Sequence, residues 1–213
     1  MQFIKNYLFL VSLAAVIILD PFLEDLVFGS LISLCLLSVT AGLCLLVLSF
    51  EKSVIRLLII FSFLIVGFNF ILLLNPSCTS SLLQYVSLSI VVFLYAFLLF
   101  YLLMTSRTLS IKDISNAISI YLLLGIGFGF LYSFIEKLHP GAFVFQAQES
   151  KDIYGDMIYF SIVTLTTAGF GDIHPVHKIA KAVVMTEAVT GVLFIAITIG
   201  RLVGIGSGQM KKE

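Results

Sequence analysis

Six runs of apolar residues divide the chain, and each is close to the length of a membrane-spanning helix. They cover residues 6–23, 26–50, 54–74, 82–104, 115–136 and 176–205. A helix needs about 20 mainly apolar residues to cross the hydrocarbon core of a bilayer. The chain is 60% hydrophobic and 11% charged, whereas a soluble domain is about half apolar and a quarter charged. We therefore predict an all-α membrane protein with six transmembrane helices.

The charges between the runs predict how these helices are oriented. Basic residues fall on the N-terminal tail, the second and fourth connections and the C-terminal end: Lys5, Lys52, Arg56, Arg107, Lys112, Arg201, Lys211 and Lys212. Acidic residues dominate the other side: Asp20, Glu24, Asp25, Glu136, Glu149, Asp152, Asp156 and Asp172. The positive-inside rule then places both termini in the cytoplasm, with the helices in the plasma membrane. The net charge is zero, which gives no indication of a nucleic-acid partner.

The first run could also be read as a cleaved signal peptide, because Lys5 precedes its apolar stretch. No small-residue cleavage site follows the run, and the segment DPFLED at 20–25 leads directly into the next one. We therefore expect a retained first helix.

The segment 139–178, between the last two runs, does not fit a simple six-helix bundle. Its residues 153–166 are predicted to form a helix of about 20 Å, which is too short for a hydrocarbon core of roughly 30 Å. The same residues are too apolar for an ordinary external loop. A re-entrant helix that enters the membrane and returns satisfies both facts. Non-helical backbone at membrane depth is tolerated where protein buries it or water lines it, so the returning residues 167–171 should face a water-filled path.

The returning residues belong to the stretch TLTTAGFGD at 164–172. Gly169 and Gly171 alternate with Ala168 and Phe170, and glycine readily adopts left-handed backbone conformations. An alternation of backbone hands can turn successive carbonyl groups toward one side, and the Thr167 hydroxyl can extend this row of oxygens. Such oxygens suit alkali and alkaline-earth cations. A single strand cannot surround an ion, so several chains should meet around an axis.

The stretch TLTTAGFGD resembles the potassium-channel signature, in which the filter reads Thr-Val-Gly-Tyr-Gly. The block IYFSIVTLTTAGFGDIHP and its two flanking helices, about 115–206, resemble the pore domain of bacterial two-helix channels. The resemblance implies a homotetramer whose selectivity filter consists of Thr167, Ala168, Gly169, Phe170 and Gly171. It also implies K⁺ binding at Thr167, Ala168, Gly169 and Phe170, and an acidic outer mouth at Asp172.

Two filter positions depart from the family pattern. Ala168 replaces the usual valine and Phe170 the usual tyrosine. Both side chains point away from the ion in such filters, so the row of carbonyl groups is retained. The tyrosine hydroxyl normally braces the filter against aromatic partners on the pore helix, and this chain has no tryptophan. We therefore expect a less firmly braced filter.

The last apolar run carries a glycine, Gly191, 19 residues after Asp172. Relatives have a flexible glycine near this position, and glycine in a helix interior eases bending. Close packing against a neighbouring helix is an equally good explanation. The resemblance also implies that Val192, Ile195 and Ile199 line the cavity below the filter. An apolar lining of this kind suits a gate that closes by dewetting.

Glu187 is an acid deep within an apolar span. An ionisable residue in such a place is costly, and it usually marks a functional site with a specific partner. Glu187 could brace the back of the pore helix by bonding to the hydroxyl of Thr164 or Thr166. Alternatively, it could face the cavity as part of a ring that attracts cations. We favour the bracing role.

Several other patterns predict structure more readily than chemistry. His174 and His177 lie near Asp172, but a turn after the filter explains them better than a metal site does. Gly125 and Gly129 match the small-xxx-small pattern of helix packing. The sequence contains no phosphate-binding loop, nucleophile triad or paired catalytic carboxylates. We therefore expect no enzymatic activity and no cofactor.

These patterns predict three parts: a four-helix transmembrane domain at 1–110, a pore domain at 111–206 and a short cytoplasmic tail at 207–213. A voltage sensor needs several arginines along one helix, and the run 82–104 has none, so steep voltage gating is not expected. The short tail predicts no cytosolic regulatory domain. The resulting hypothesis is a potassium-selective channel whose partners are copies of itself, the lipid bilayer and K⁺. The alternatives are a weakly selective cation channel, or a membrane transporter or sensor subunit in which the loop is structural.

Overall fold

The computed structural model describes residues 2–23, 29–47, 52–74, 77–106, 110–146 and 153–210. Its long helices are α1 (Gln2–Leu23), α2 (Gly29–Val47), α3 (Lys52–Leu74), α4 (Cys78–Thr105), α5 (Ile111–Leu138) and α7 (Lys178–Met210). A shorter helix, α6 (Ile153–Leu165), lies between α5 and α7 in the sequence, and two short strands, β1 (Phe143–Phe145) and β2 (Ile173–Pro175), flank it. Each predicted apolar run is therefore a helix, as is the predicted segment 153–166. The predicted loop charges Glu24, Asp25, Arg107, Glu149, Asp152, Lys211 and Lys212 lie outside the described residues.

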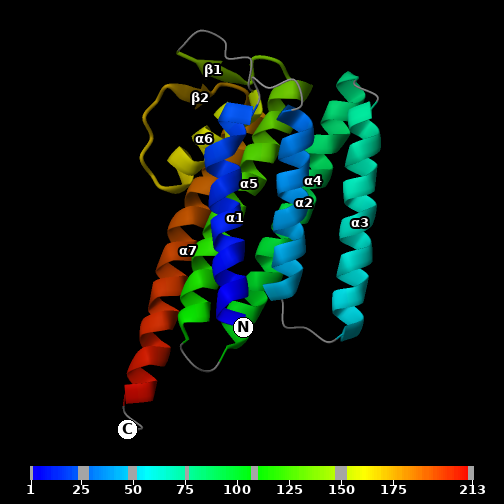
Figure 1. Cartoon of the computed structure of the whole chain (residues 1–213). Helices are drawn as coiled ribbons and strands as arrows, with labels where there is room; N and C mark the ends of the chain where they lie inside the picture. The colour runs from blue at the N-terminus through cyan, green and yellow to red at the C-terminus, as the bar shows by residue number, and fades with distance from the viewer. Residues whose placement is uncertain are drawn as a thin grey trace.

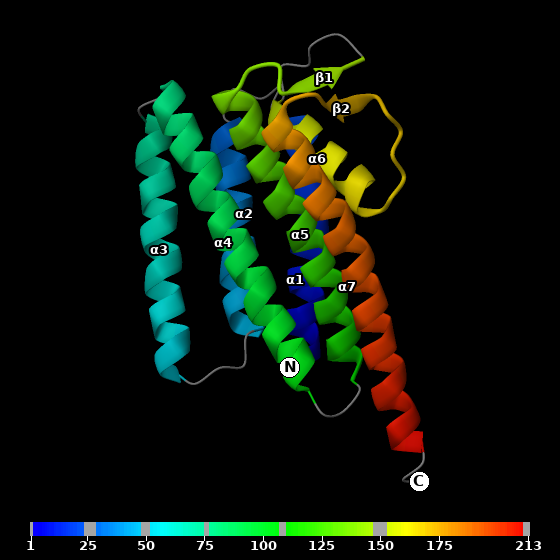
Figure 2. The ribbon, with the colours of Figure 1, turned by 180° about the vertical axis from the view of Figure 1, so that it is seen from behind.

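The long helices run in alternating directions in one elongated bundle (Figure 1). The start of α1 and the end of α7 lie at the same end of the bundle, and β1 and β2 lie at the other, as the view from behind also shows (Figure 2). The helix α3 is at one edge of the bundle and α7 is at the opposite edge. The two ends of the chain are thus on the side opposite the strands, as an even number of crossings requires.

Two helices begin at serine caps that satisfy the first free backbone N–H groups. Before α4, the Ser80 backbone N–H donates to the Ser77 hydroxyl at 3.0 Å, and the Ser77 N–H donates to the Ser80 hydroxyl at 2.7 Å. Before α5, the Ser110 N–H donates to a carboxylate oxygen of Asp113 at 2.8 Å. Reciprocal bonds of this type define the start of a helix.

Three of the described helical segments meet the length and hydropathy that a membrane crossing requires. Among the described residues, Thr79–Thr105, Ile111–Leu138 and Lys178–Ser207 are long and apolar enough to cross a bilayer. The apolar parts described for the other helices are shorter, at Lys5–Leu19, Cys35–Leu45, Leu58–Leu72 and Ile153–Leu165. The chain is therefore a membrane protein by length and composition, and the count of six crossings stays a prediction.

The main hydrophobic core joins the first four helices to α5. Leu13 of α1, Cys44 of α2, Leu99 of α4 and Ile120 of α5 belong to one buried cluster. The core therefore continues across the predicted domain boundary at residue 110.

A second buried cluster lies at the end of the bundle that carries the strands. Tyr132 and Phe160 contact Phe143, with ring centroids 5.4 and 5.5 Å from that of Phe143. The antiparallel strands pair Phe143 with Pro175 and Phe145 with Ile173. The sequence predicted only a turn after Asp172, and this is wrong for residues 173–175, because they pair with a strand from before α6.

The glycines of α5 allow α6 to pack closely against it. A Cβ atom at Gly125 would lie 2.4 Å from Cδ1 of Ile162, and one at Gly129 would lie 2.7 Å from Cγ1 of Ile158. The Ser161 hydroxyl oxygen of α6 lies only 2.8 Å from the Gly125 carbonyl oxygen. The predicted helix-packing role of Gly125 and Gly129 is confirmed.

Replacing Gly129 by alanine should therefore destabilise the fold. Its new Cβ would also lie 3.0 Å from the backbone Cα of Ile158, so the two helices must separate to accommodate it. Overpacking of this kind costs about 1–3 kcal/mol, and we expect a lower thermal unfolding midpoint in detergent. Gly67→Ala is the matched control, because a Cβ at Gly67 meets nothing within 4 Å and alanine favours the helix. Equal midpoints for the two variants would contradict this packing.

Candidate functional site

The candidate site begins where α6 ends. The helix α6 has 13 residues, about 20 Å of length, and it packs against both α5 and α7. Its last turn continues into the backbone of residues 166–171. The Thr167 N–H donates to the Thr164 carbonyl, and the Ala168 N–H donates to the Val163 carbonyl, both at 3.0 Å. The start of the returning segment is thus anchored to the end of the helix that precedes it.

The backbone of the returning segment alternates in hand. Thr167, Gly169 and Gly171 have positive φ angles of 59°, 54° and 81°, and Ala168 and Phe170 between them do not. Thr167 is the only non-glycine residue with a positive φ in the part of the chain that the structure describes. A residue other than glycine rarely adopts this conformation, and such strain is concentrated at functional sites. The alternation expected for the glycines is present, and it extends one residue earlier than expected.

The side chains of this segment are exposed in the single chain. Residues 166–171 are all exposed, and Phe170 is 70% exposed. Isolated apolar groups on a protein surface are ordinary, but a contiguous apolar patch indicates an interaction surface. The predicted cavity residues on α7 are also exposed, with Val192 at 52%, Ile195 at 42% and Ile199 at 56% exposure. The segment and this face of α7 thus lack cover from the rest of the described chain.

Asp172, at the predicted mouth, is held from two sides. The Tyr159 hydroxyl of α6 donates to its carboxylate at 2.7 Å, and the Gln146 N–H donates to its backbone carbonyl at 2.8 Å. The bond to Asp172 raises the pKa of the Tyr159 phenol above its usual 10, so this group stays protonated and donating at neutral pH. The sequence did not predict a role for Tyr159. Its spacing of 13 residues from Asp172 gives no local signal.

Removing the Tyr159 hydroxyl should loosen this mouth. A hydrogen bond to a charged group contributes about 1.5–3 kcal/mol when it is well formed. Tyr159 is 40% exposed, so we expect its hydrogen bond to contribute an energy at the lower end of this range. The Tyr159→Phe variant should then show a several-fold lower ion flux in liposomes. Tyr7→Phe is the control, because Tyr7 is an exposed tyrosine near the N-terminal end of α1, outside the site. Flux through Tyr159→Phe equal to that of the control would show that the bond has no part in conduction.

Glu187 is completely buried, and its carboxylate faces α5 and α6. One oxygen accepts a hydrogen bond of 2.5 Å from the Ser161 hydroxyl, and the other accepts one from the Tyr132 hydroxyl. The predicted partners Thr164 and Thr166 are therefore wrong, and the Thr166 hydroxyl instead donates to the Ile162 carbonyl within its own helix at 2.7 Å. Sequence reasoning missed Ser161, which lies one turn earlier on α6, and Tyr132 on α5. The carboxylate ties three helices together behind the returning segment.

Gly191 is the point of closest approach between α7 and α6. A Cβ atom there would lie 2.8 Å from the backbone oxygen of Leu165, the last residue of α6. The same oxygen accepts a hydrogen bond from the Tyr121 hydroxyl of α5 at 2.8 Å. The α7 helix is continuous through Gly191. The close-packing explanation of this glycine is therefore confirmed, and its action as a hinge stays a prediction.

One of the two histidines that follow Asp172 packs against a histidine at the end of α5. His177 stacks against His139, with ring centroids 4.5 Å apart. Within the described ranges, no group of three or more His, Cys, Asp or Glu residues is placed to hold a metal ion. The stack instead joins the end of α5 to the start of α7.

The C-terminal part of α7 is tied to α4. The Arg201 guanidinium donates to the Leu103 carbonyl at 3.0 Å and to the Ser106 carbonyl at 2.5 Å. These carbonyls belong to the last turn and the C-cap of α4, where backbone acceptors have no partner within the helix. Sequence reasoning assigned Arg201 only to the charge balance of that side.

Comparison with known families supports one assignment. Residues 117–206, which contain α6, the returning segment and most of the helices on either side, match a family model described as an ion channel. No curated protein and no solved structure matches the chain. The matched residues include every part of the site described above: the short helix, the segment of alternating hand, Asp172 and the buried carboxylate. Residues 117–206 are therefore similar to an ion-channel domain, which supports a pore-loop channel in this part of the chain.

Proposed function

We propose that the chain forms a homotetrameric, potassium-selective channel in the plasma membrane. Four copies of residues 167–171 line one axis, and their backbone carbonyl groups replace the water around a K⁺ ion. The observation that carries this proposal is the alternating backbone hand of Thr167, Gly169 and Gly171 directly after a short buried helix. Thr167, Ala168, Gly169 and Phe170 supply the oxygens, and Asp172 forms the outer mouth.

The direction of α6 favours a cation at this place. The C-terminal end of a helix carries a partial negative charge, and α6 ends at Leu165, two residues before Thr167. Four such ends directed at one axis stabilise a cation there.

The apolar face of α7 supports assembly around that axis. Its exposed residues are Met185, Val189, Val192, Leu193, Ile195, Ile197, Ile199 and Val203. In the tetramer part of this face meets neighbouring copies. Val192, Ile195 and Ile199 line the cavity below the filter, where an apolar wall lets the path close by dewetting.

The arrangement of the helices supports six crossings with cytoplasmic termini. The helices α1, α2 and α3 have 22, 19 and 23 residues, or about 28–35 Å of length, close to the hydrocarbon thickness. Both ends of the chain lie opposite the strands and the mouth. The basic residues Lys5, Lys112 and Arg201 belong to the end that the positive-inside rule assigns to the cytoplasm.

Ion flux from liposomes tests the proposal. Purified protein is reconstituted with K⁺ inside, and external K⁺ is followed after dilution into K⁺-free buffer that contains a protonophore. We expect K⁺ efflux that drives proton uptake, and little uptake when Na⁺ replaces K⁺ inside. The mass of the purified protein in detergent is expected to equal that of four chains. An absence of flux from a folded tetramer would instead favour a transporter or sensor subunit with a structural loop.

A further inference from the structure

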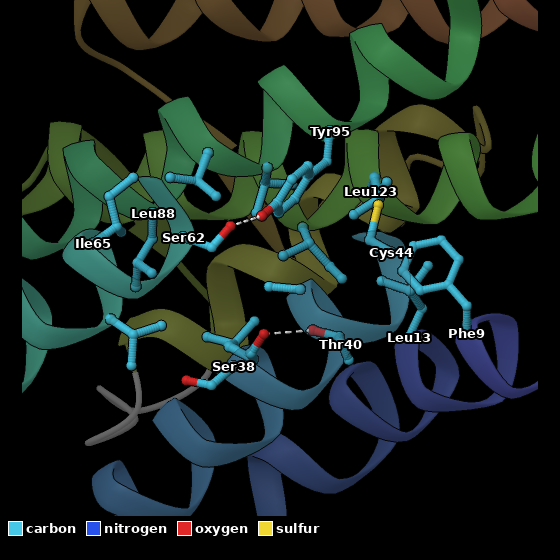
Figure 3. A pocket seen from close by; sticks show the side chains of 16 residues that line it. Phe9, Leu13, Ser38, Thr40, Cys44, Ser62, Ile65, Leu88, Tyr95 and Leu123 are labelled. Atoms are coloured by element: carbon cyan, nitrogen blue, oxygen red, sulfur yellow. Dashed lines mark hydrogen bonds between the residues drawn. The ribbon is translucent and has the colours of Figure 1, made fainter. Parts of the chain in front are cut away.

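A cavity of about 50 Å³ lies inside the first five helices. Figure 3 shows its inner end, where the Cys44 side chain of α2 lies near Phe9 and Leu13 of α1 and Leu123 of α5. Cys44 and Leu13 are almost fully buried. Neither the ion-channel family match nor the proposed filter uses this space.

The cavity adjoins a groove of about 330 Å³ between α2 and α3. Four residues line both spaces: Ser38, Ala41, Ser62 and Val66. The outer wall of the groove includes Ile59 and Phe63 of α3, and Phe63 is 82% exposed. Gly42 of α2 also lines it, and a Cβ there would meet nothing within 4 Å. The interior cavity is therefore separated from the groove at the side of the bundle only by side chains that line both spaces.

The polar side chains along this path are occupied by the protein itself. The Ser62 hydroxyl donates to the Leu58 carbonyl at 2.7 Å and also bonds to the Tyr95 hydroxyl. The Thr40 hydroxyl donates to the Leu37 carbonyl at 2.8 Å. A stable buried water needs two to four polar partners, and apolar cavities stay dry or take apolar ligands. Apart from Ser38 and Cys44, the remaining lining is aliphatic and aromatic, so the ligand should be apolar.

The position of the groove identifies the source of such a ligand. Ile59 and Val66 lie in the middle of α3, which spans Lys52–Leu74. In the proposed six-crossing topology, on which this step rests, they are at the depth of the hydrocarbon core. The helix α3 is on the edge of the bundle away from α7, so it faces lipid when copies assemble through α7. Phospholipid acyl chains are the most concentrated apolar groups at that place.

We propose that the groove and the cavity bind one acyl chain of a bilayer phospholipid. The chain enters between α2 and α3 beside Gly42, and its end lies among Leu13, Cys44 and Leu123. Leu123 is two residues from Gly125, where α5 packs against α6. The bound chain thus fills the space behind the helix that supports the pore helix. This proposal does not depend on ion selectivity.

Photo-crosslinking in vesicles tests it. The full-length protein is reconstituted in phosphatidylcholine vesicles that contain a small fraction of phosphatidylcholine with a diazirine at the end of one acyl chain. After irradiation, peptide mass spectrometry locates the adducts. Lipid around the protein labels exposed positions such as Phe63 in any case. The expected diagnostic result is labelling of the buried residues Leu13, Cys44 or Leu123, and its absence overturns the proposal.

Two glycine variants give the matched comparison. Gly42→Phe fills the groove and is expected to reduce adducts on the buried residues at least tenfold. Gly67→Phe adds the same side chain to an exposed helical glycine of α3 that does not line the groove. This variant should leave the adducts on the buried residues unchanged. Equal inner labelling in both variants overturns the proposal. Ala41→Leu, a smaller addition to the shared wall, repeats the comparison if Gly42→Phe does not retain the wild-type elution volume.

A free fatty acid with the same terminal diazirine separates the two possible lipid sources. At an equal mole fraction, the labelled phospholipid should give at least as much inner labelling as the acid. Inner labelling by the acid alone would show that the site takes a free fatty acid, and it would overturn the assignment to a phospholipid.

Discussion

Glu187→Ala is expected to reduce K⁺ flux at least tenfold and to lower the thermal unfolding midpoint of the assembled protein. The carboxylate is fully buried and accepts hydrogen bonds from Ser161 and Tyr132, which are also fully buried. Alanine leaves the Tyr132 hydroxyl without this acceptor, at a cost of about 1–3 kcal/mol, and it leaves a cavity that adds to the loss. Because Ser161 lies on α6, the pore helix loses its tie to α5 and α7 directly behind the filter.

The isosteric variant separates this role from an electrostatic one. Glu187→Gln keeps the volume and one carbonyl oxygen, and its amide can donate to the Tyr132 oxygen. We expect it to retain most of the flux. If Glu187 instead formed a ring that attracts cations, the conductance of Glu187→Gln would fall as steeply as that of Glu187→Ala. Wild-type flux through Glu187→Ala would contradict the bracing role altogether.

A double-mutant cycle measures the bond itself. The unfolding midpoints of Glu187→Ala, Tyr132→Phe and the double variant are compared with that of the wild type. Residues in direct contact show coupling of about 0.5–3 kcal/mol, and we expect a non-zero value within that range. Additive effects would place the stabilising contact elsewhere.

Gly169→Ala is expected to abolish most K⁺ flux without preventing assembly. Gly169 has a φ of 54°, in the left-handed region that costs an L-residue about 1–2 kcal/mol. The alanine backbone relieves this strain by rotating its peptide group, which turns a carbonyl group away from the axis. In the proposed tetramer the loss occurs in all four subunits at once, so we expect at least a tenfold fall in flux from liposomes.

Gly141→Ala is a close control for backbone strain. Gly141 has a φ of 83°, and a Cβ there meets nothing within 4 Å, as at Gly169. It lies in the turn after α5 and outside the filter. The Gly141→Ala variant should lower the stability of the protein slightly and leave the ion flux unchanged. Flux through Gly169→Ala equal to that through Gly141→Ala would show that residue 169 has no special part in conduction.

The features that local sequence determines were predictable. The apolar runs gave all six long helices within a few residues, because each run is bounded by polar and helix-breaking residues. The short helix predicted at 153–166 is also present as α6, and its re-entry into the membrane stays a prediction. Alternate glycines predicted the alternating backbone of 167–171, and Thr167 joined it because the Thr164 and Val163 carbonyls hold the N–H groups of Thr167 and Ala168.

The features that depend on long-range packing were not predictable. Glu187 was expected to have a partner on the pore helix, but which residue faces it depends on the rotation of α6 against α7. The bond from Tyr159 to Asp172 joins residues 13 apart, and the pairing of β1 with β2 joins segments almost 30 residues apart. The groove between α2 and α3 has no sequence signal, since it arises from how loosely two apolar helices meet.

The reversal potential under bi-ionic conditions is the most direct test of potassium selectivity. Current is measured across a planar bilayer with equal concentrations of K⁺ on one side and Na⁺ on the other. The carbonyl-lined filter predicts a reversal potential of at least about 60 mV, with the sign of a K⁺-selective path, since a tenfold ratio for a monovalent ion corresponds to 59 mV. A reversal potential that stays near zero when Na⁺ replaces K⁺ would contradict the account and identify a weakly selective cation channel.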